Sequence, residues 1–222
     1  DVMQPLVIGG RTGVGTTLLL QQLEQHIDLE GLYRHRGSSF GYRAHPQPSQ
    51  IDIENSLAIA LLKHRHNQVS KLVLEDEAPN IGSRSVPRGI MQAMQQAPLI
   101  LIEADIDTRV EAVFEEYIHV ALAEFQQLHG DALGFEIWAT NLTEAMDRIR
   151  RRLGDQRHHQ LRDIMNDAIE QQRQHANGDH HKDWIRCFLL DYYDPMYDYQ
   201  IGKKSGMRGL NFSRWPVSQE TG

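Results

Sequence analysis

The chain has 222 residues, of which 40% are hydrophobic and 24% charged, as in ordinary globular proteins that bury a sizeable core. It contains no apolar run of about 18 residues that would cross a bilayer, and its first residues lack the layout of a signal peptide, so we expect a cytoplasmic protein without a membrane partner. The formal net charge of -7 excludes a generic polyanion binder, although local basic clusters leave nucleic acid open as a partner.

The first third of the chain predicts alternating strands and helices. A short apolar run over residues 4–8 is typical of a buried strand, and a glycine loop and a helix-forming segment follow it. Further strands are expected to end near residues 27–31 and to span residues 71–77 and 98–105, with a helix over residues 52–66. Strands separated by helices indicate an α/β fold, with a P-loop NTPase-like parallel sheet flanked by helices.

The remainder of the chain predicts helices. Apolar residues keep a helical period over residues 110–128, and further helices are expected over residues 143–153, 156–175 and 180–193, where Pro195 would end the last one. We therefore divide the chain into an α/β core over residues 1–106 and a mainly helical subdomain over residues 107–222 that packs on the core.

The stretch GGRTGVGTT, residues 9–17, has the spacing of a phosphate-binding loop. In the pattern G-x-x-x-x-G-K-[ST], backbone amides, a lysine and a hydroxyl hold phosphate groups, and here Thr16 stands in place of the lysine. The candidate phosphate-binding residues are Gly10, Thr12, Gly13, Val14, Gly15, Thr16 and Thr17. Because a predicted strand precedes the loop and a predicted helix follows it, we favour a weakened phosphate site over a plain turn with a threonine cap.

Acidic residues end the predicted strand KLVLEDE at residues 71–77. Ligands of an open α/β sheet bind beyond the carboxyl ends of its strands, which is where these acids would lie. We expect Asp76 to hold Mg²⁺ together with the hydroxyl of Thr17, and we take Asp76 and Glu77 as candidate catalytic residues. A solvated acidic turn before Pro79 is the alternative.

The loop HRGSSFG, residues 35–41, is expected at the same edge of the sheet. Arginine suits bidentate contact with phosphate and histidine can carry a proton, so His35 and Arg36 are candidate catalytic residues. Ser38 and Ser39 are candidate phosphate-binding residues. An ordinary polar loop held by serine turns explains the same residues equally well.

Two basic segments, RIRRRL and YYDPMYDYQIGKK, are candidates for contact with RNA. Arginines three and four residues apart share one face of a predicted helix, and a tyrosine beside lysines can stack on an unpaired base while the lysines contact phosphates. The candidate tRNA-binding residues are Arg148, Arg151, Arg152, Tyr197, Lys203 and Lys204. A solvated helix and tyrosines that cap the core are the alternative interpretations.

Several words of the sequence together resemble one family, the tRNA 2-selenouridine synthases. They are GGRTGVGTT, IDLEGLYRHRGSSFG, VLEDEAPNIGS, RRRLGDQRHHQL and YYDPMYDYQIGKK, and they extend from about residue 7 to residue 204. Two features depart from the family pattern. The family's glycine loop has a lysine at the position of Thr16, and its N-terminal rhodanese-like domain bears a catalytic cysteine that Cys187 does not match.

The resemblance implies an enzyme that acts on the wobble 2-thiouridine of tRNA. The sulfur would be alkylated by geranyl diphosphate, and the S-geranyl group would then leave as selenophosphate delivers selenium to the same carbon. The implied partners are therefore tRNA, geranyl diphosphate, selenophosphate and a rhodanese-like domain, and the phosphate loop would bind the diphosphate.

Two other functions stay open. A small-molecule or nucleoside kinase would also use a phosphate loop and an arginine-bearing helical region, but Thr16 counts against it because a kinase needs the lysine on the transferred phosphate. A non-catalytic tRNA-binding module would show salt-sensitive binding of tRNA without a response to Mg²⁺ or to diphosphate ligands.

Overall fold

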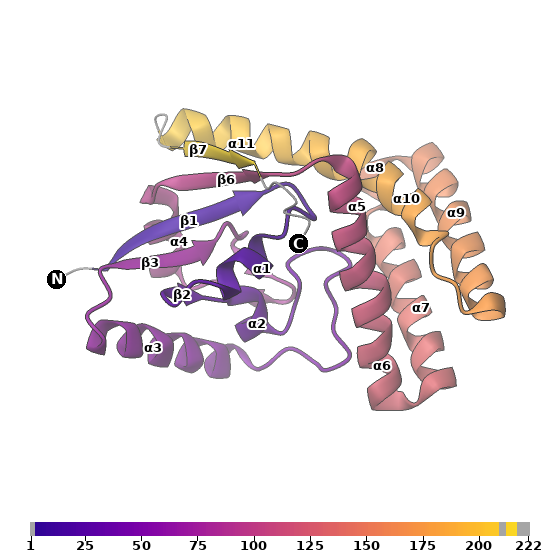
Figure 1. Cartoon of the computed structure of the whole chain (residues 1–222), viewed down its shortest axis with the longest axis horizontal. Coiled ribbons are helices and arrows are strands. Elements are labelled where there is room, and N and C mark those ends of the chain that lie inside the picture. The colour runs from indigo at the N-terminus through magenta and orange to yellow at the C-terminus, as the bar shows by residue number, and fades with distance from the viewer. Residues whose placement is uncertain (1–2, 209–211, 217–222) are drawn as a thin grey trace, which may run out of the picture.

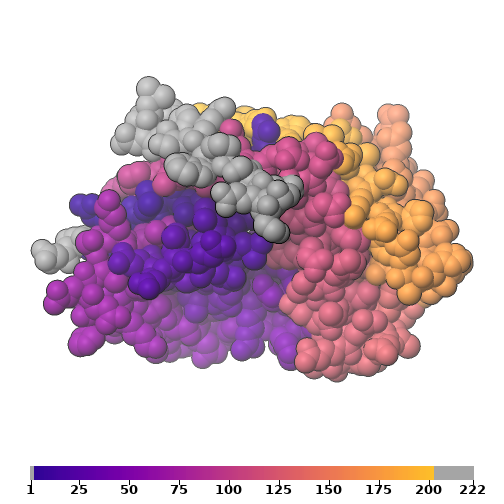
Figure 2. Space-filling model, viewed as in Figure 1, coloured from indigo at the N-terminus to yellow at the C-terminus, as the bar shows by residue number. Residues whose placement is uncertain are grey.

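The computed structural model describes residues 3–208 and 212–216, with side chains up to residue 202. A sheet with its covering helices forms one half of the molecule, and a group of helices forms the other half (Figure 1). The two halves adjoin across the face drawn in Figure 2, where indigo to magenta residues meet salmon and orange ones. No helix in the described ranges is both long and apolar enough to cross a membrane.

Strands and helices alternate in the first half, and helices follow one another in the second. In chain order the elements are β1 (Gln4–Gly10), α1 (Thr16–Gln21), β2 (His26–Ile27), α2 (Leu29–Tyr33), α3 (Gln50–His66), β3 (Lys71–Glu75), β4 (Asn80–Ile81), β5 (Arg84–Ser85), α4 (Arg88–Gln96), β6 (Leu99–Glu103), α5 (Ile106–Phe114), the π-helical η1 (Glu115–Val120), α6 (Ala121–His129), α7 (Asp131–Arg148), α8 (Arg150–Leu153), α9 (Asp155–His175), α10 (His181–Phe188), the π-helical η2 (Leu189–Tyr193), α11 (Asp194–Arg208) and β7 (Phe212–Pro216).

The main sheet has the strand order β2-β3-β1-β6-β7, and each neighbouring pair is parallel. β1 is the middle strand. Gln4 lies opposite Lys71 of β3, and Val7 lies opposite Leu99 of β6. The α/β class expected from the sequence is confirmed. Because β1 is flanked on both sides, the glycine loop that follows it begins at the carboxyl edge of the sheet, between two neighbouring strands.

Three sets of buried side chains support the two halves, and one of them, with Ile8 and Leu20, packs beside β1 and α1. Val7 and Leu101 belong to the set that packs between the sheet and the helices beside it. Trp138 and Trp184 are the largest members of the set that fills the helical half. Their indole N–H groups donate to the carbonyl of Tyr117 at 3.1 Å and to Nδ1 of His181 at 2.8 Å. Both tryptophans are thus buried without an unsatisfied donor.

The segment IDLEG differs from the expected end of a strand. Only His26 and Ile27 are extended, and α2 begins at Leu29. The reason is local, since Asp28 is the N-cap of α2 and its carboxylate accepts the N–H of Gly31 at 2.7 Å. The capping side chain of Asp28 therefore starts a helix where the apolar pattern predicted the end of a strand.

Pro195 does not end the helix that precedes it, contrary to the expectation from the sequence. η2 runs directly into α11, and Pro195 is the second residue of α11. A proline inside a helix interrupts its hydrogen-bond ladder, and here the π-helical turn η2 lies directly before Pro195, where that ladder already departs from the α-helical pattern. The helical run therefore continues to Arg208 and brings the word YDPMYDYQIGKK back toward the sheet half (Figure 1).

The strand β7 was not expected either, because residues 107–222 were assigned to a mainly helical subdomain. Phe212 lies opposite Leu99 and Pro216 opposite Glu103, so β7 extends the sheet beyond β6. Tyr197 and Ile201 of α11 also pack against the core of the sheet half. The last described part of the chain therefore belongs to the sheet as much as to the helical half.

Candidate functional site

The stretch GGRTGVGTT forms a glycine-rich connection from β1 to α1. Gly13 and Gly15 have φ values of +85° and +81°, in the left-handed region that glycine adopts without strain. Gly15 is the N-cap of α1, and no side chain caps this helix. The first N–H groups of α1 therefore lack intrahelical partners. A strand, a glycine loop and an uncapped helix start follow one another in the order that an anion site requires.

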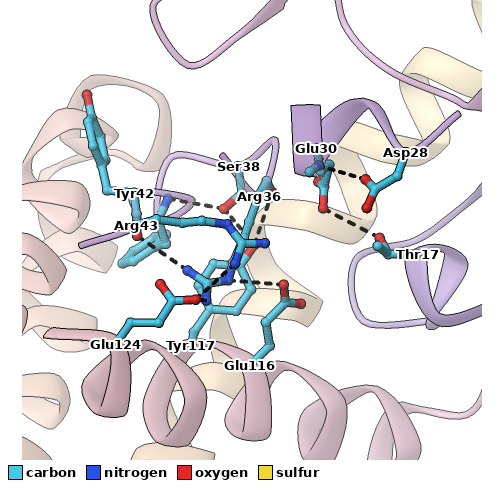
Figure 3. A network of polar contacts seen from close by, with 12 residues as sticks. Thr17, Asp28, Glu30, Arg36, Ser38, Tyr42, Arg43, Glu116, Tyr117 and Glu124 are labelled. Carbon is cyan, nitrogen blue, oxygen red and sulfur yellow. Dashed lines mark hydrogen bonds and ion pairs between the residues drawn. The ribbon is translucent and has the colours of Figure 1, made fainter. Parts of the chain in front are cut away.

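Two carboxyl groups lie beside Thr17, which is in the first turn of α1. The hydroxyl of Thr17 donates to Oε2 of Glu30 at 3.4 Å (Figure 3). Glu75 ends β3 and is only 4% exposed, and neither of its carboxyl oxygens makes a hydrogen bond of regular geometry within the described residues. We call Glu30 and Glu75 the loop-side acids. No described arginine or lysine forms an ion pair with either of them.

Burial raises the pKa of both loop-side acids. The pKa of Glu30 rises to about 9, first through burial and then through the charges of Glu77 and Glu75. Burial raises the pKa of Glu75 to about 7, and the hydroxyl of Thr17 offsets only part of that rise. Carboxyl groups in such a setting keep a proton near neutral pH or exchange it for a bound cation.

The other two acids after β3 lie on either side of this pair. Asp76 lies beside Gly9, where an added Cβ would come within 2.8 Å of the Cβ of Asp76. Glu77 lies beside Gly37, where an added Cβ would meet Glu30 at 2.7 Å and Glu77 at 3.1 Å. The structure therefore gathers all of these acids at the carboxyl edge of the sheet. The role of Asp76 as a Mg²⁺ ligand and the catalytic roles of Asp76 and Glu77 stay predictions.

No set of three or more His, Cys, Asp or Glu side chains is arranged as a metal centre in the described parts of the chain. A metal ion at the loop-side acids would therefore need ligands from elsewhere, such as phosphate oxygens.

Arg36 and Arg43 from the segment after α2 pair with two glutamates of the helical half (Figure 3). Nε of Arg36 lies 3.1 Å from Oε1 of Glu116, and Nη2 of Arg36 lies 3.0 Å from Oε1 of Glu124. Nη1 of Arg43 donates to the same oxygen of Glu124 at 2.9 Å. We call Glu116 and Glu124 the helix-side acids. The side chain of Arg36 is 1% exposed, so in this conformation its charge is used to join the loop to η1 and α6.

His35 is enclosed within the same loop. Its ring is 2% exposed and lies between Gly41 and Gly82, where an added Cβ would come within 2.8 Å and 2.7 Å of ring atoms. Burial and the charge of Arg36 lower the pKa of His35 to about 4, so the ring is neutral at physiological pH. This position holds the loop against the turn after β4. A role for His35 in proton transfer stays a prediction.

The two serines of HRGSSFG make contacts inside the protein. Oγ of Ser38 lies 2.9 Å from the hydroxyl of Tyr117 and accepts the N–H of Phe40 at 3.1 Å. The carbonyl of Ser39 accepts a hydrogen bond from Arg148 at 3.0 Å. The ring of Phe40 packs among the aromatic side chains of the helical core. The loop is thus anchored to the helical half, and phosphate contacts from either serine stay a prediction.

The three candidate arginines do not lie on one continuous helix. α7 ends at Arg148 and α8 begins at Arg150, and Ile149 between them has a φ of -96° and a ψ of -2°. The guanidinium of Arg148 lies 4.8 Å from the ring centre of Tyr42. Arg151 and Arg152 are exposed, and neither forms an ion pair with a described residue. These two cations are therefore available to an outside partner.

The tyrosines of the segment YYDPMYDYQIGKK differ in how far they are buried. The ring of Tyr197 packs against the core of the sheet half, and its hydroxyl is buried without a hydrogen-bond partner among the described residues. Tyr199 is 64% exposed. Lys203 and Lys204 belong to α11, but their side chains lie outside the described residues. Stacking on a base by Tyr197 stays a prediction.

Comparison with known proteins places this arrangement in one family. A family model described as the tRNA 2-selenouridine synthase AAA domain matches residues 3–214. The chain belongs to the tRNA 2-selenouridine synthase family. The resemblance read from GGRTGVGTT, HRGSSFG and YYDPMY is thereby confirmed.

Curated relatives named tRNA 2-selenouridine synthase agree with this assignment. The relative from Pseudomonas syringae pv. syringae is 46% identical over 200 residues, which are 90% of this chain and 55% of the relative. The relative from Marinobacter nauticus is 42% identical over 200 residues, and that from Sulfurovum sp. is 41% identical over 206 residues. The chain thus spans about half the length of the curated relatives that it matches.

The structure adds residues that the sequence analysis did not single out. Glu75 was passed over in favour of its two acidic neighbours, although its place at the end of a buried strand was visible. Arg109 lies next to the apolar stripe of α5 that contains Val110 and Val113, and it is 2% exposed. A charged residue so close to an apolar stripe is the signal that would have marked it, because arginine is seldom fully buried unless paired.

Proposed function

We propose that this chain is the diphosphate-binding and tRNA-binding part of an enzyme that modifies the wobble 2-thiouridine of tRNA. In the first step the sulfur of the base attacks the allylic carbon of geranyl diphosphate. A carbon–sulfur bond forms, the carbon–oxygen bond breaks, and diphosphate leaves with the bonding electrons. In the second step the selenium of selenophosphate attacks the base carbon that carried the sulfur, a carbon–selenium bond forms, and the carbon–sulfur bond breaks as geranyl thiolate leaves. Water then cleaves the selenium–phosphorus bond and releases phosphate, which leaves selenium on the base.

The observation that carries the proposal is the glycine loop at the carboxyl end of the central strand, in a chain of this family. Backbone N–H groups of residues 13–17 would stabilise the charge that develops on the leaving diphosphate. Thr16 lacks the charge of a lysine but removes none of these amides. We therefore infer a weakened phosphate site that still supports release of diphosphate, whereas a kinase would lose the cation that holds its transferred phosphate.

Mg²⁺ belongs to the proposal, with Thr17 and Asp76 as its expected protein ligands. The loop-side acids, Glu30 and Glu75, add two hard oxygen donors beside the hydroxyl of Thr17. Such donors suit Mg²⁺, which is commonly held by one or two carboxylates and by phosphate oxygens. When bound, the ion would supply positive charge to the diphosphate. The two acids would then bind in their deprotonated form.

The proposal assigns contact with tRNA to the basic candidates, led by the exposed Arg151 and Arg152. A rhodanese-like domain, as a further part of the enzyme or a separate subunit, assists the transfer of selenium. His35 and Arg36 hold the loop that lies between the phosphate site and the helical half, so their substitution would alter the placement of both substrates.

The test compares two glycines of positive φ, one in the phosphate loop and one between α6 and α7. Gly15 and Gly130 have φ values of +81° and +82°, and a Cβ added to either would meet no atom within 4 Å. The ψ of Gly15 is 29°, in the left-handed region, whereas that of Gly130 is 161°, where few residues other than glycine are found, so alanine imposes at least as much backbone strain at Gly130 as at Gly15. We expect Gly15→Ala to weaken binding of pyrophosphate and geranyl diphosphate in calorimetry, and to slow alkylation of thiolated tRNA. Gly130→Ala should leave both unchanged.

Equal loss in the two variants would mean that the glycine loop is not the phosphate site. Formation of ADP from ATP with one particular nucleoside acceptor would replace the proposal with a kinase. Salt-sensitive binding of tRNA, without any response to Mg²⁺ or pyrophosphate, would replace it with a non-catalytic binding module.

A further inference from the structure

The phosphate loop is held by a buried arginine from the helical half. Nε of Arg109, in α5, donates to the carbonyl oxygen of Thr12 at 2.9 Å. The two terminal nitrogens of the same guanidinium donate to the carboxylate of Asp194, in α11, at 2.6 Å and 3.0 Å. One side chain therefore joins the loop to two separate helices.

The backbone of α5 supports the same peptide from a second direction. Gly13 follows Thr12 with a φ of +85°, and an added Cβ would lie 2.6 Å from the carbonyl oxygen of Arg109. The chain is thus pressed against α5 at Gly13 while the Arg109 side chain binds the preceding carbonyl. These two contacts fix the plane of the peptide between Thr12 and Gly13.

A fixed peptide plane has a consequence for the opposite side of the loop. The peptide is trans, so its N–H points away from its carbonyl. With the carbonyl of Thr12 turned toward Arg109, the N–H of Gly13 is turned away from Arg109, and it makes no hydrogen bond to a described residue. This N–H is therefore an oriented donor that is available to an anion.

The charge of Arg109 requires its partner. The side chain of Arg109 is 3% exposed and that of Asp194 is 13% exposed, and an unpaired guanidinium at that depth would be strongly unfavourable. Asp194 is therefore what allows an arginine to reach the loop from the interior. It lies in the word YYDPMY, which had been considered only for its tyrosines.

We propose that Arg109 is the positioning residue of the phosphate loop. Through the carbonyl of Thr12 it aims the N–H of Gly13 at a bound phosphate oxygen, and Asp194 supplies its counter-charge. The proposal rests on the proposed function insofar as the ligand is a diphosphate. Its structural part, the orientation of the peptide by Arg109, does not depend on the ligand.

A second arginine of the loop, Arg11, pairs with the same helix, α11, and provides a matched control. Nη2 of Arg11, within the loop, donates to Asp198 at 2.7 Å and 2.9 Å. Asp198 lies one turn after Asp194 in α11. The Arg11 and Asp198 side chains are 44% and 58% exposed, and Arg11 contributes no bond to a loop carbonyl. Both pairs thus join the loop to α11, but only the Arg109 pair orients a peptide.

The experiment replaces each pair by apolar side chains of similar size. Arg109→Met with Asp194→Leu removes the donor to Thr12 and leaves no unpaired charge, an exchange that is often neutral for stability. We expect its Kd for pyrophosphate to rise about tenfold or more, as for a lost hydrogen bond to a charged group. The N–H of Val14, which donates to the carbonyl of Arg11 at 3.2 Å, should exchange faster with deuterium in the free protein once the loop is no longer held. Arg11→Met with Asp198→Leu should change the Kd less than about threefold, as for an exposed pair.

An unchanged Kd and unchanged exchange in the Arg109 double variant would overturn the proposal. If the wild-type chain binds no pyrophosphate, the proposed function fails, and the exchange rates alone decide the role of Arg109. Arg109→Lys serves if the double variant does not fold. It keeps a charge for Asp194 but has no Nε donor, so we expect the same loss of affinity with the melting temperature retained.

Discussion

Two groups of acidic side chains lie near the HRGSSFG loop, and they differ in their ion pairs; Figure 3 shows Glu30 of the loop-side acids together with both helix-side acids. The helix-side acids, Glu116 and Glu124, form ion pairs with Arg36 and Arg43. Burial raises the pKa of Glu116 too, but the charges of Arg36 and Arg43 offset part of that rise. The loop-side acids form no ion pair with a described residue, and burial raises the pKa of Glu75 to about 7.

The two groups differ in whether their carboxylates are already paired with arginines. On the helix side, three ion pairs join the loop to η1 and α6. On the loop side, burial without a counter-charge makes the folded protein prefer a protonated carboxyl group or a cation. Acids that remain unpaired next to a glycine loop therefore indicate where a ligand or ion belongs, while paired acids indicate where the fold needs support.

The largest effect should come from breaking the helix-side pairs. Glu116→Gln together with Glu124→Gln leaves the buried guanidinium of Arg36 without a carboxylate, which should lower the free energy of unfolding by about 3–5 kcal/mol. Urea denaturation measures this. Glu115→Gln is the control, because Glu115 pairs with His119 at the surface and its loss should cost less than about 1 kcal/mol. Similar losses in both variants would remove the distinction between the two sides.

The loop-side acids should make stability depend on pH. The pKa of Glu75 is raised in the folded state, so the folded chain binds more protons than the unfolded chain between the ordinary value of 4.5 and about 7. The free energy of unfolding should therefore fall as pH rises through this window. For Glu75 alone the fall should be on the order of 1–3 kcal/mol.

Glu75→Gln tests this assignment, because the amide cannot ionise. The variant should match the wild type at about pH 5 and be more stable than the wild type at about pH 8, as measured by urea denaturation at both values. A variant that is less stable at the higher pH would mean that the carboxylate of Glu75 has a stabilising partner in the free protein.

Placing a cation on the loop side should sharpen the contrast. Thr16→Lys restores one positive charge to the phosphate loop and should tighten binding of pyrophosphate about tenfold, since a hydrogen bond to a charged group contributes about 1.5–3 kcal/mol. Calorimetry measures this, with Thr16→Ser as the neutral control. No change would mean that another cation already does the work of the lysine.

The smallest effect on stability is expected in the basic segment RIRRRL, where arginines also differ in whether they form an ion pair. Arg150 pairs with Asp155 at 2.8 Å, whereas Arg151 and Arg152 pair with no described residue. Alanine at positions 151 and 152 should change the free energy of unfolding by less than about 0.5 kcal/mol. It should reduce the salt dependence of tRNA binding by about 0.7–0.9 per lost phosphate contact. Arg150→Ala should leave that slope unchanged.

The central strands of the sheet could be predicted from the sequence because their signals are local. Apolar runs, a glycine loop of fixed spacing and helix-forming segments predicted β1, β3, β6 and the order in which they occur, whereas β7 was missed because it pairs with a strand far away along the chain. The same reasoning failed at Asp28, where a capping side chain starts a helix, and at Pro195, where the helical run continues after a π-helical turn.

The candidate site could be predicted only in part, because its connections run between distant segments. The glycine loop and the acids after β3 were found from spacing. The contact of Arg109 with Thr12 joins residues 97 positions apart, and that of Arg36 with Glu124 joins residues 88 positions apart. A pattern of residue types along the chain cannot show that Arg36 is neutralised from α6. The sequence therefore predicted which candidate residues gather at the carboxyl edge of the sheet but not which of their charges are paired.

The pairing of β7 with β6 has a consequence for how the molecule is made. Leu99 of β6 is synthesised well before Phe212, its opposite residue in β7. At the usual speed of the ribosome, on the order of 5–20 residues per second, β6 is without this neighbouring strand for roughly ten seconds. During this time β6 is a free edge strand that can pair with another chain. Newborn chains should therefore be most prone to aggregate, and most dependent on chaperones, while the helical half is being synthesised.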